Sequence, residues 1–299
     1  MRRSASFPVF LTLLLLAACG GGPTTPPVTA TPTLTPTPTV PPIVPTVTSA
    51  PTAVPTVPPN ATAGLRERGV LCPTDDEAAL AYYNQAVDLQ QQGRLEEAKE
   101  LYRKAIEEDP DYCDAMDNLG VILRQEGDIE QAMYWYTRSI TALPTNVVAR
   151  LNLAFAYTLQ GQLDAAMAEY ERVIEIDPED PEGYYGKGGI YLKLDQPEEA
   201  LVYFEKAEEL YVRRSSPKIA YARYSIGAAH FMLDDYEQAR IYLELAYPEM
   251  SDEPLANYFL GMCYLQPDMQ DLERARTYLL RAEELGVEIP EEIREQLDM

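Results

Sequence analysis

Histidine is almost absent from this sequence, and so are the motifs that usually carry enzymatic chemistry. The only histidine is His230. It stands where the corresponding segments elsewhere in the chain carry tyrosine, so a packing role is favoured over that of a general base. The sequence contains no phosphate-binding Walker loop, no dinucleotide-binding glycine motif and no Cys-x-x-Cys pair. We therefore expect no catalytic activity, no cofactor and no metal site.

Charge is missing from the first 65 residues, apart from Arg2 and Arg3. All 48 acidic residues follow Arg66, and the whole chain has a formal net charge of −24. Such a charge opposes binding to phosphate backbones and to anionic lipid surfaces, so nucleic acid is not an expected partner. A charged partner should be basic, although an acidic surface also serves simply to keep a domain soluble.

Long apolar runs are missing as well. The longest begins at Phe7 and ends at Ala18, which is too short for the roughly 20 residues of a membrane-spanning helix. Together with Arg2 and Arg3 it fits the core of an export signal. Its end, Leu16-Ala17-Ala18-Cys19, resembles the lipobox of bacterial lipoproteins. An ordinary secretory signal or a short anchor helix is the alternative.

The lipobox resemblance implies a signal peptide over residues 1–18 and a mature chain that begins at a lipid-modified Cys19. The chain would then be anchored to a cell membrane and face its extracytoplasmic side, at the cell surface or in the periplasm. Residues 19–65 form the next segment, in which residues 20–63 contain 13 prolines and 13 threonines without a charge. This composition predicts a disordered, extended polyproline II linker with a reach on the order of 100 Å.

The rest of the chain is built from repeats. Three segments, 82–110, 116–144 and 150–178, align without a gap, and their closing prolines, Pro110, Pro144 and Pro178, are 34 residues apart. Each unit reads as two amphipathic helices with a glycine at the turn between them. Small residues recur where the two helices must approach closely, as at Gly120 and Ala132. The pattern resembles the tetratricopeptide repeat, which implies an all-α fold.

We expect an α-solenoid of about six such repeats over residues 78–288, after a connecting segment over 66–77. The repeats lie near 79–112, 113–146, 147–180, 181–212, 220–253 and 254–288, with an insertion around 211–219. Residues 289–299 should form a capping helix, since Pro290 suits a first helical turn and the outer face is polar.

Four cysteines are present, and export would permit disulfides. Cys72 precedes the first helix and Cys113 opens the third, so a bridge between them is possible and would be worth about 3–4 kcal/mol in the loop-entropy model. Two free thiols are the alternative. Cys263, inside a helix, is expected to be a buried free thiol.

The resemblance also implies a binding surface, because the first helices of stacked tetratricopeptide repeats line a concave groove. The residues at the family's groove positions are Tyr83, Val87, Asp117, Val121, Leu151, Asn152, Phe155, Tyr185, Gly189, Tyr224, Ala228, Tyr258 and Met262. The basic and asparagine pattern with which some members hold a terminal carboxylate is absent, apart from Asn118 and Asn152.

We interpret the chain as a membrane-anchored scaffold that binds a protein or peptide partner of unknown identity in this groove. Two alternatives remain. The groove could take a glycan or small solute, or the chain could be a regulatory subunit of a cell-envelope enzyme or of a pilus or secretion assembly.

Overall fold

The computed structural model describes residue 72 and residues 74–299. The predicted signal peptide, Cys19, the predicted linker over 19–65 and most of the connecting segment over 66–77 lie outside the described residues. The described part is all-helical, and none of its helices is both long enough and apolar enough to cross a membrane.

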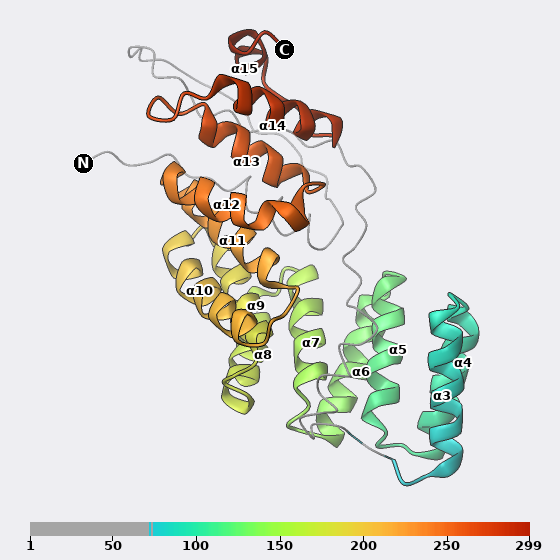
Figure 1. Ribbon diagram of the computed structural model, residues 1–299. Coiled ribbons are helices and arrows are strands. Elements are labelled where there is room, and N and C mark those ends of the chain that lie inside the picture. The colour runs from blue at the N-terminus through green and yellow to red at the C-terminus, as the bar shows by residue number, and fades with distance from the viewer. Residues whose placement is uncertain (1–71, 73) are drawn as a thin grey trace, which may run out of the picture. The chain divides into compact units, whose positions relative to one another are not determined.

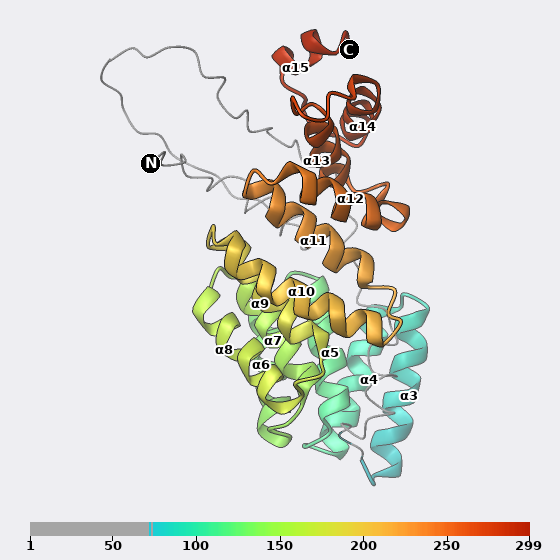
Figure 2. The ribbon, with the colours of Figure 1, turned by 60° about the vertical axis from the view of Figure 1, so that its left-hand side comes forward.

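Six helix pairs follow one another along the described chain (Figures 1 and 2). The pairs are α3 (Glu77–Gln91) with α4 (Leu95–Glu108), α5 (Cys113–Gln125) with α6 (Ile129–Ala142), α7 (Val147–Leu159) with α8 (Leu163–Ile176), α9 (Pro181–Lys193) with α10 (Pro197–Arg213), α11 (Ile219–Met232) with α12 (Tyr236–Met250), and α13 (Pro254–Tyr264) with α14 (Leu272–Glu284). A short helix, α15 (Glu291–Gln296), ends the chain. The predicted α-solenoid of six repeats with a C-terminal helix is confirmed.

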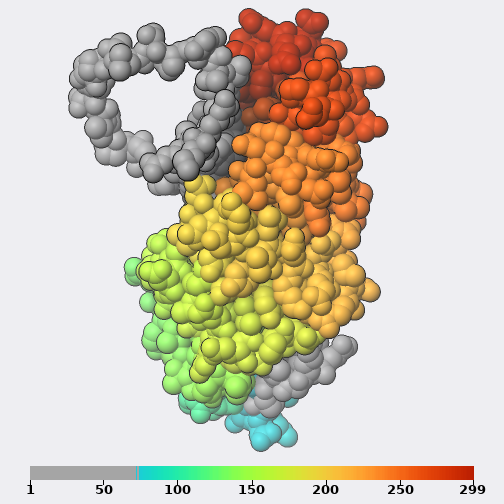
Figure 3. Space-filling view, turned by 90° about the vertical axis from the view of Figure 1, so that its left-hand side faces the viewer, coloured from blue at the N-terminus to red at the C-terminus, as the bar shows by residue number. Residues whose placement is uncertain are grey.

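The described residues fall into two compact units, one ending at Ile190 and the other beginning at Tyr191. The N-terminal unit has a core in which Tyr102, Tyr136, Leu119 and Ile122 are fully buried. In the C-terminal unit, Phe204, Phe259 and Leu243 are buried to the same degree. The space-filling view shows the orange and red atoms of this unit adjoining one another on the face turned to the viewer (Figure 3).

The turn inside each repeat requires a residue in the left-handed conformation. The first three repeats place Gly93, Gly127 and Gly161 there, with φ between +72° and +87°. The fourth and fifth use Asp195 and Asp234, both at φ +58°. Aspartate tolerates this region better than most residues, which explains how these repeats turn without glycine.

Two repeats differ from the others in helix or loop length. α10 has 17 residues, three more than α4, α6 or α8, and so takes up part of the predicted insertion near 211–219. The loop between α13 and α14, over residues 265–271, is longer than the loop between α11 and α12, over residues 233–235. The helix pairs themselves are preserved.

Within each pair, the first helix carries a small residue against a large side chain of the second. A Cβ atom added to Gly120 of α5 would come within 2.5 Å of the Tyr136 ring of α6. The same addition at Gly227 would meet Leu243 at 2.7 Å, and at Gly261 it would meet Leu279 at 2.5 Å. Because these partners are fully buried, they have little room to move, and the small residue sets how closely the helices pack.

We predict that Gly120→Ala lowers the free energy of unfolding by about 1–3 kcal/mol, because the added methyl group displaces the Tyr136 ring. The loss should appear although alanine is the better helix former by roughly 1 kcal/mol. Urea unfolding followed by circular dichroism measures it. Repeat 1 provides a matched control, since it has Ala86 at the equivalent position. There the reverse change, Ala86→Gly, should destabilise. A Gly120→Ala variant as stable as the parent would contradict the packing argument.

Candidate functional site

The first helices of the N-terminal unit carry a row of partly exposed side chains at matched positions. Val87 on α3, Val121 on α5 and Phe155 on α7 follow one another at intervals of 34 residues, and all three are half-buried. Leu151 and Asn152, one turn earlier on α7, are half-buried too. We call these five residues the first-helix row. It presents mainly apolar surface with one amide.

A single arginine adjoins this row. The guanidinium carbon of Arg124 lies 4.8 Å from the centre of the Phe155 ring, a cation–π distance. Arg124 is only 8% exposed, and its Nε has no hydrogen-bond partner in the described part of the chain. The repeat pattern does not indicate this residue, because it lies at the end of α5, beyond the groove positions inferred from the family.

Five residues expected in the groove are buried instead. Tyr83 is 3% exposed, accepts a hydrogen bond from Asn118 Nδ2 at 3.1 Å, and contacts the ring of Tyr112 at 5.1 Å between centroids. In the C-terminal unit, Tyr224, Ala228 and Tyr258 are buried. We therefore leave these four residues out of the proposed contact surface. The fifth buried residue is Asp117. Tyr185 and Met262 are half-buried.

Asp117 is the one buried carboxylate among the expected groove residues. Its Oδ2 accepts a hydrogen bond from Asn146 Nδ2 at 2.8 Å, and the same amide nitrogen donates to Ser139 Oγ at 2.9 Å. Oδ1 has no partner among the described residues. Burial raises the pKa of Asp117 to about 7, against the opposing effect of the Ser139 and Asn146 hydrogen bonds. Asp117 thus belongs to the interior, where its neutral form is favoured.

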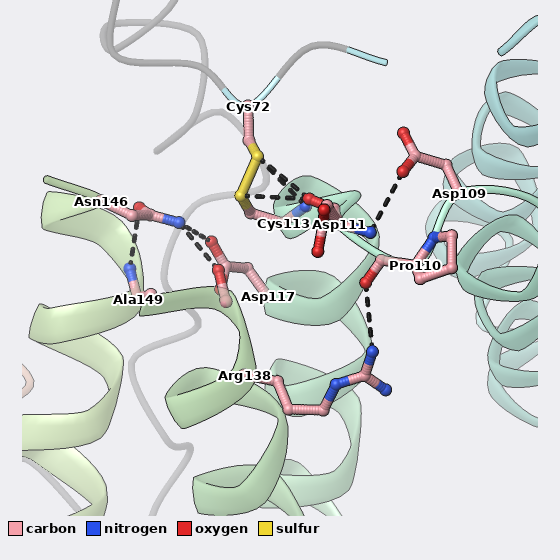
Figure 4. The surroundings of a disulfide bond; sticks show 10 residues. Cys72, Asp109, Pro110, Asp111, Cys113, Asp117, Arg138, Asn146 and Ala149 are labelled. Carbon is pink, nitrogen blue, oxygen red and sulfur yellow. Dashed lines mark hydrogen bonds between the residues drawn. A yellow bond between two sulfur atoms is a disulfide. The ribbon is translucent and has the colours of Figure 1, made fainter. Parts of the chain in front are cut away.

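Cys72 and Cys113 are joined by a disulfide, with their Cα atoms 5.4 Å apart. Of the two alternatives that the sequence allowed, a bridge or two free thiols, the structure has the bridge. Figure 4 shows the Cys72 sulfur beside the backbone of the α4–α5 loop, 3.3 Å from the carbonyl oxygen of Asp111. The bond fixes the chain ahead of α3 to the first turn of α5. Cys263 is a buried free thiol, as expected, and burial raises its pKa to about 12.

The single histidine is half-buried at the end of α11. The His230 ring stacks on Tyr242 with centroids 5.8 Å apart, and its Nδ1 lies 3.4 Å from Asp235 Oδ2. These contacts suit the packing role that the sequence favours. Within residues 72 and 74–299, no group of three or more histidine, cysteine, aspartate or glutamate side chains is placed to hold a metal ion.

A polar aromatic network that the sequence analysis missed links the last two repeats of the C-terminal unit. The Tyr264 hydroxyl donates to Glu244 and accepts from Arg274 Nη1 at 2.8 Å. Its ring stacks on that of Tyr278, with centroids 5.8 Å apart. Because the phenol is 4% exposed and its hydroxyl is satisfied on both sides, this network stabilises the packing of the two repeats rather than offering a site.

Comparison with known families agrees with this geometry. Three models of the tetratricopeptide repeat match residues 83–147, 123–190 and 181–248. A model of the Sel1 repeat matches residues 63–90 and 254–287, which include the sixth predicted repeat. The chain thus carries tetratricopeptide and Sel1 repeats, and its fold is a tetratricopeptide-type α-solenoid. No curated protein sequence matches it.

Similar solved structures are also tetratricopeptide proteins or complexes that contain this fold. The APC/C hetero-tetramer Cut9–Hcn1 has 17% identity and a TM-score of 0.63; the match covers 74% of this chain but only 42% of that one. PilF of Pseudomonas aeruginosa has 24% identity and a TM-score of 0.62, over 70% of this chain and 92% of PilF. A tetratricopeptide repeat protein of Parabacteroides merdae has 21% identity and a TM-score of 0.53. That match covers 75% of this chain and 98% of the Parabacteroides protein. At these identities the likeness shows the fold alone.

We predict a pH-dependent penalty at Asp117. Its folded-state pKa of about 7 exceeds the ordinary value of 3.8, so the stability it contributes is fully present below pH 3.8 and is lost as the pH rises through 7. Relative to Asp117→Asn, the parent should therefore lose about 2 kcal/mol of unfolding free energy between about pH 5 and pH 8. Urea titrations of both proteins across this range measure the difference. Asp88→Asn, an exposed change on α3, is the control. Parallel pH profiles for parent and Asp117→Asn would refute the assignment.

Proposed function

We propose that this protein is a lipid-anchored, extracytoplasmic scaffold that binds a segment of a protein partner along the first helices of its N-terminal unit. It performs no chemistry of its own. The tetratricopeptide fold is typical of protein–protein interaction scaffolds, and the families and structures it resembles are generally non-catalytic.

The observation that carries the binding proposal is the first-helix row. Three of its members, Val87, Val121 and Phe155, recur once per repeat on α3, α5 and α7, so a ligand that follows the row meets an apolar side chain at each step. Repeated, partly exposed apolar positions of this kind are what an extended or helical peptide requires for its side chains. The partner segment should therefore present several apolar side chains in sequence.

Charge further restricts the partner. The chain is strongly acidic, with a formal net charge of −24, so a neutral or basic segment approaches it more readily than an acidic one. Buried cations elsewhere in the N-terminal unit are already paired: Lys99 contacts Glu126 at 2.6 Å, and Arg150 contacts Glu169 at 2.7 Å. These charges are neutralised internally. Arg124, which lies 4.8 Å from the Phe155 ring, is the cation that adjoins the row. The row therefore offers a partner apolar contact beside one arginine.

Two features support an extracytoplasmic location. The tetrad that ends at Cys19 resembles a lipobox, and the Cys72–Cys113 disulfide suits an oxidising compartment better than a reducing one. A lipid on Cys19 would hold the domain at the membrane, where binding to a neighbouring membrane protein gains from the raised local concentration.

Val121→Glu should weaken capture of the partner about tenfold or more, because it places a charge at the centre of the apolar row. The measurement is quantitative crosslinking and affinity capture from membranes of the native host. Val202→Glu is the matched control, since Val202 lies on the second helix α10 and is 65% exposed. It should capture the same partner as the parent. Equal capture by both variants, with unchanged helical circular dichroism, would exclude the row as the binding surface.

Cys19→Ala should remove the lipid anchor. We expect the variant to leave the membrane fraction or to retain its signal peptide, because alkylation of the sulfur precedes cleavage in the lipoprotein pathway that the lipobox resembles. Fractionation and intact-mass measurement distinguish the two. Ser4→Ala, a change within the same leader, is the control. A variant that stays in the membrane fraction with a cleaved signal would show that something other than Cys19 anchors the chain.

A further inference from the structure

The second helix of the second repeat carries an aromatic cluster outside the first-helix row. Tyr134 on α6 is 53% exposed, and its ring meets that of Trp135 edge-on, with centroids 5.1 Å apart. The guanidinium carbon of Arg138, one turn further along, lies 5.1 Å from the Trp135 ring centre. We call these three residues the α6 cluster.

The arginine of this cluster is held in place from the other side. Arg138 Nη2 donates a hydrogen bond of 3.1 Å to the carbonyl oxygen of Pro110, in the loop before α5 (Figure 4). No carboxylate of the described residues forms an ion pair with Arg138. No described residue accepts a hydrogen bond from the indole N–H of Trp135. The cluster therefore combines an exposed tyrosine ring with a half-buried indole whose N–H has no acceptor among the described residues.

This combination fits a proline-rich ligand. A polyproline II segment has no internal hydrogen bonds, so its backbone carbonyls are open to donors such as an indole N–H. Proline rings pack on aromatic faces, and tyrosine and tryptophan with a free N–H or O–H are the residues that recognise such segments. An acidic ligand would be a poorer fit, because the arginine charge is already engaged by the Trp135 face and a carbonyl.

The chain contains such a segment, and it is tethered close to the cluster. Residues 51–60 read "PTAVPTVPPN", and the chain then continues to Cys72. The Cys72 sulfur lies 3.3 Å from the carbonyl oxygen of Asp111, the residue after Pro110, whose own carbonyl binds Arg138. Cys72 is thus linked to Trp135 through the Pro110–Asp111 backbone and the side chain of Arg138.

Tether length favours the same occupant. Residues 60–71 can span about 40 Å when extended, more than this short series of contacts requires. A segment on so short a tether has an effective concentration on the order of millimolar at a nearby site. A contact with a Kd about tenfold below this concentration is then largely occupied, ahead of proline-rich segments from other molecules at lower concentration.

We propose that the α6 cluster binds residues 51–60 of the same chain. Docking there places the last part of the proline- and threonine-rich segment against the domain and shortens the length available between Cys19 and the repeats. The α6 cluster lies on a second helix and the first-helix row on first helices, so this proposal and the scaffold function are tested separately.

The test uses the fluorescence of Trp135, which is the only tryptophan in the chain. Acrylamide quenching is measured on the full-length protein and on a variant with four serine substitutions: Pro51→Ser, Pro55→Ser, Pro58→Ser and Pro59→Ser. Because these prolines lie outside the repeats, the domain stays folded, which circular dichroism checks. We expect the quenching constant to rise about two- to threefold in the variant, as the indole loses its cover.

A matched control replaces four prolines at the far end of the same segment: Pro23→Ser, Pro26→Ser, Pro27→Ser and Pro32→Ser. Its quenching constant should equal that of the parent. The proposal is overturned if the two serine variants are quenched alike. It is also overturned if protection of Trp135 depends on protein concentration, because the docked segment would then come from a second copy of the chain.

Discussion

The approach of two helices within each repeat depends on a small residue facing a large one. Gly120 against Tyr136, Gly227 against Leu243 and Gly261 against Leu279 leave no room for even one methyl group. Because each helix packs mainly on its neighbours in sequence, this local distance sets the geometry of every repeat. It also decides which side of the first helix is buried and which side remains available to a partner. The first-helix row is therefore a consequence of helix pairing, not a feature added to it.

Much of this architecture follows from the sequence, because each element has a local cause. The 34-residue spacing of Pro110, Pro144 and Pro178 marks where second helices end, and Gly93, Gly127 and Gly161 mark the turns. Both signals act within one repeat and need no knowledge of distant contacts. In the fourth and fifth repeats, Asp195 and Asp234 replace the turn glycine, so the glycine signal is missing from the sequence. The turn itself is kept, because aspartate adopts the same left-handed backbone conformation.

The binding surface is less predictable, because burial depends on neighbouring repeats. Tyr83 and Phe155 both stand at family groove positions, yet Tyr83 is covered by Tyr112, which comes from the following loop. Asp117 is buried for a similar reason: Asn146, the cap of α7, reaches back to it. Arg138 finds its acceptor 28 residues earlier, at Pro110. The repeat period predicts which helix a residue lies on and which face of that helix it occupies. It does not predict how deeply the side chain is buried, because contacts with loops of adjacent repeats determine that burial.

The disulfide has a mechanical consequence for a chain held at its N-terminus. Cys72 is bonded to Cys113 at the start of α5, so α3 and α4 lie inside a covalently closed loop. A pulling force applied through the residues before Cys72 would pass across the sulfur atoms directly into α5. α3 and α4 would therefore lie off the direct path of a force that acts between the N-terminal residues and the repeats after the first.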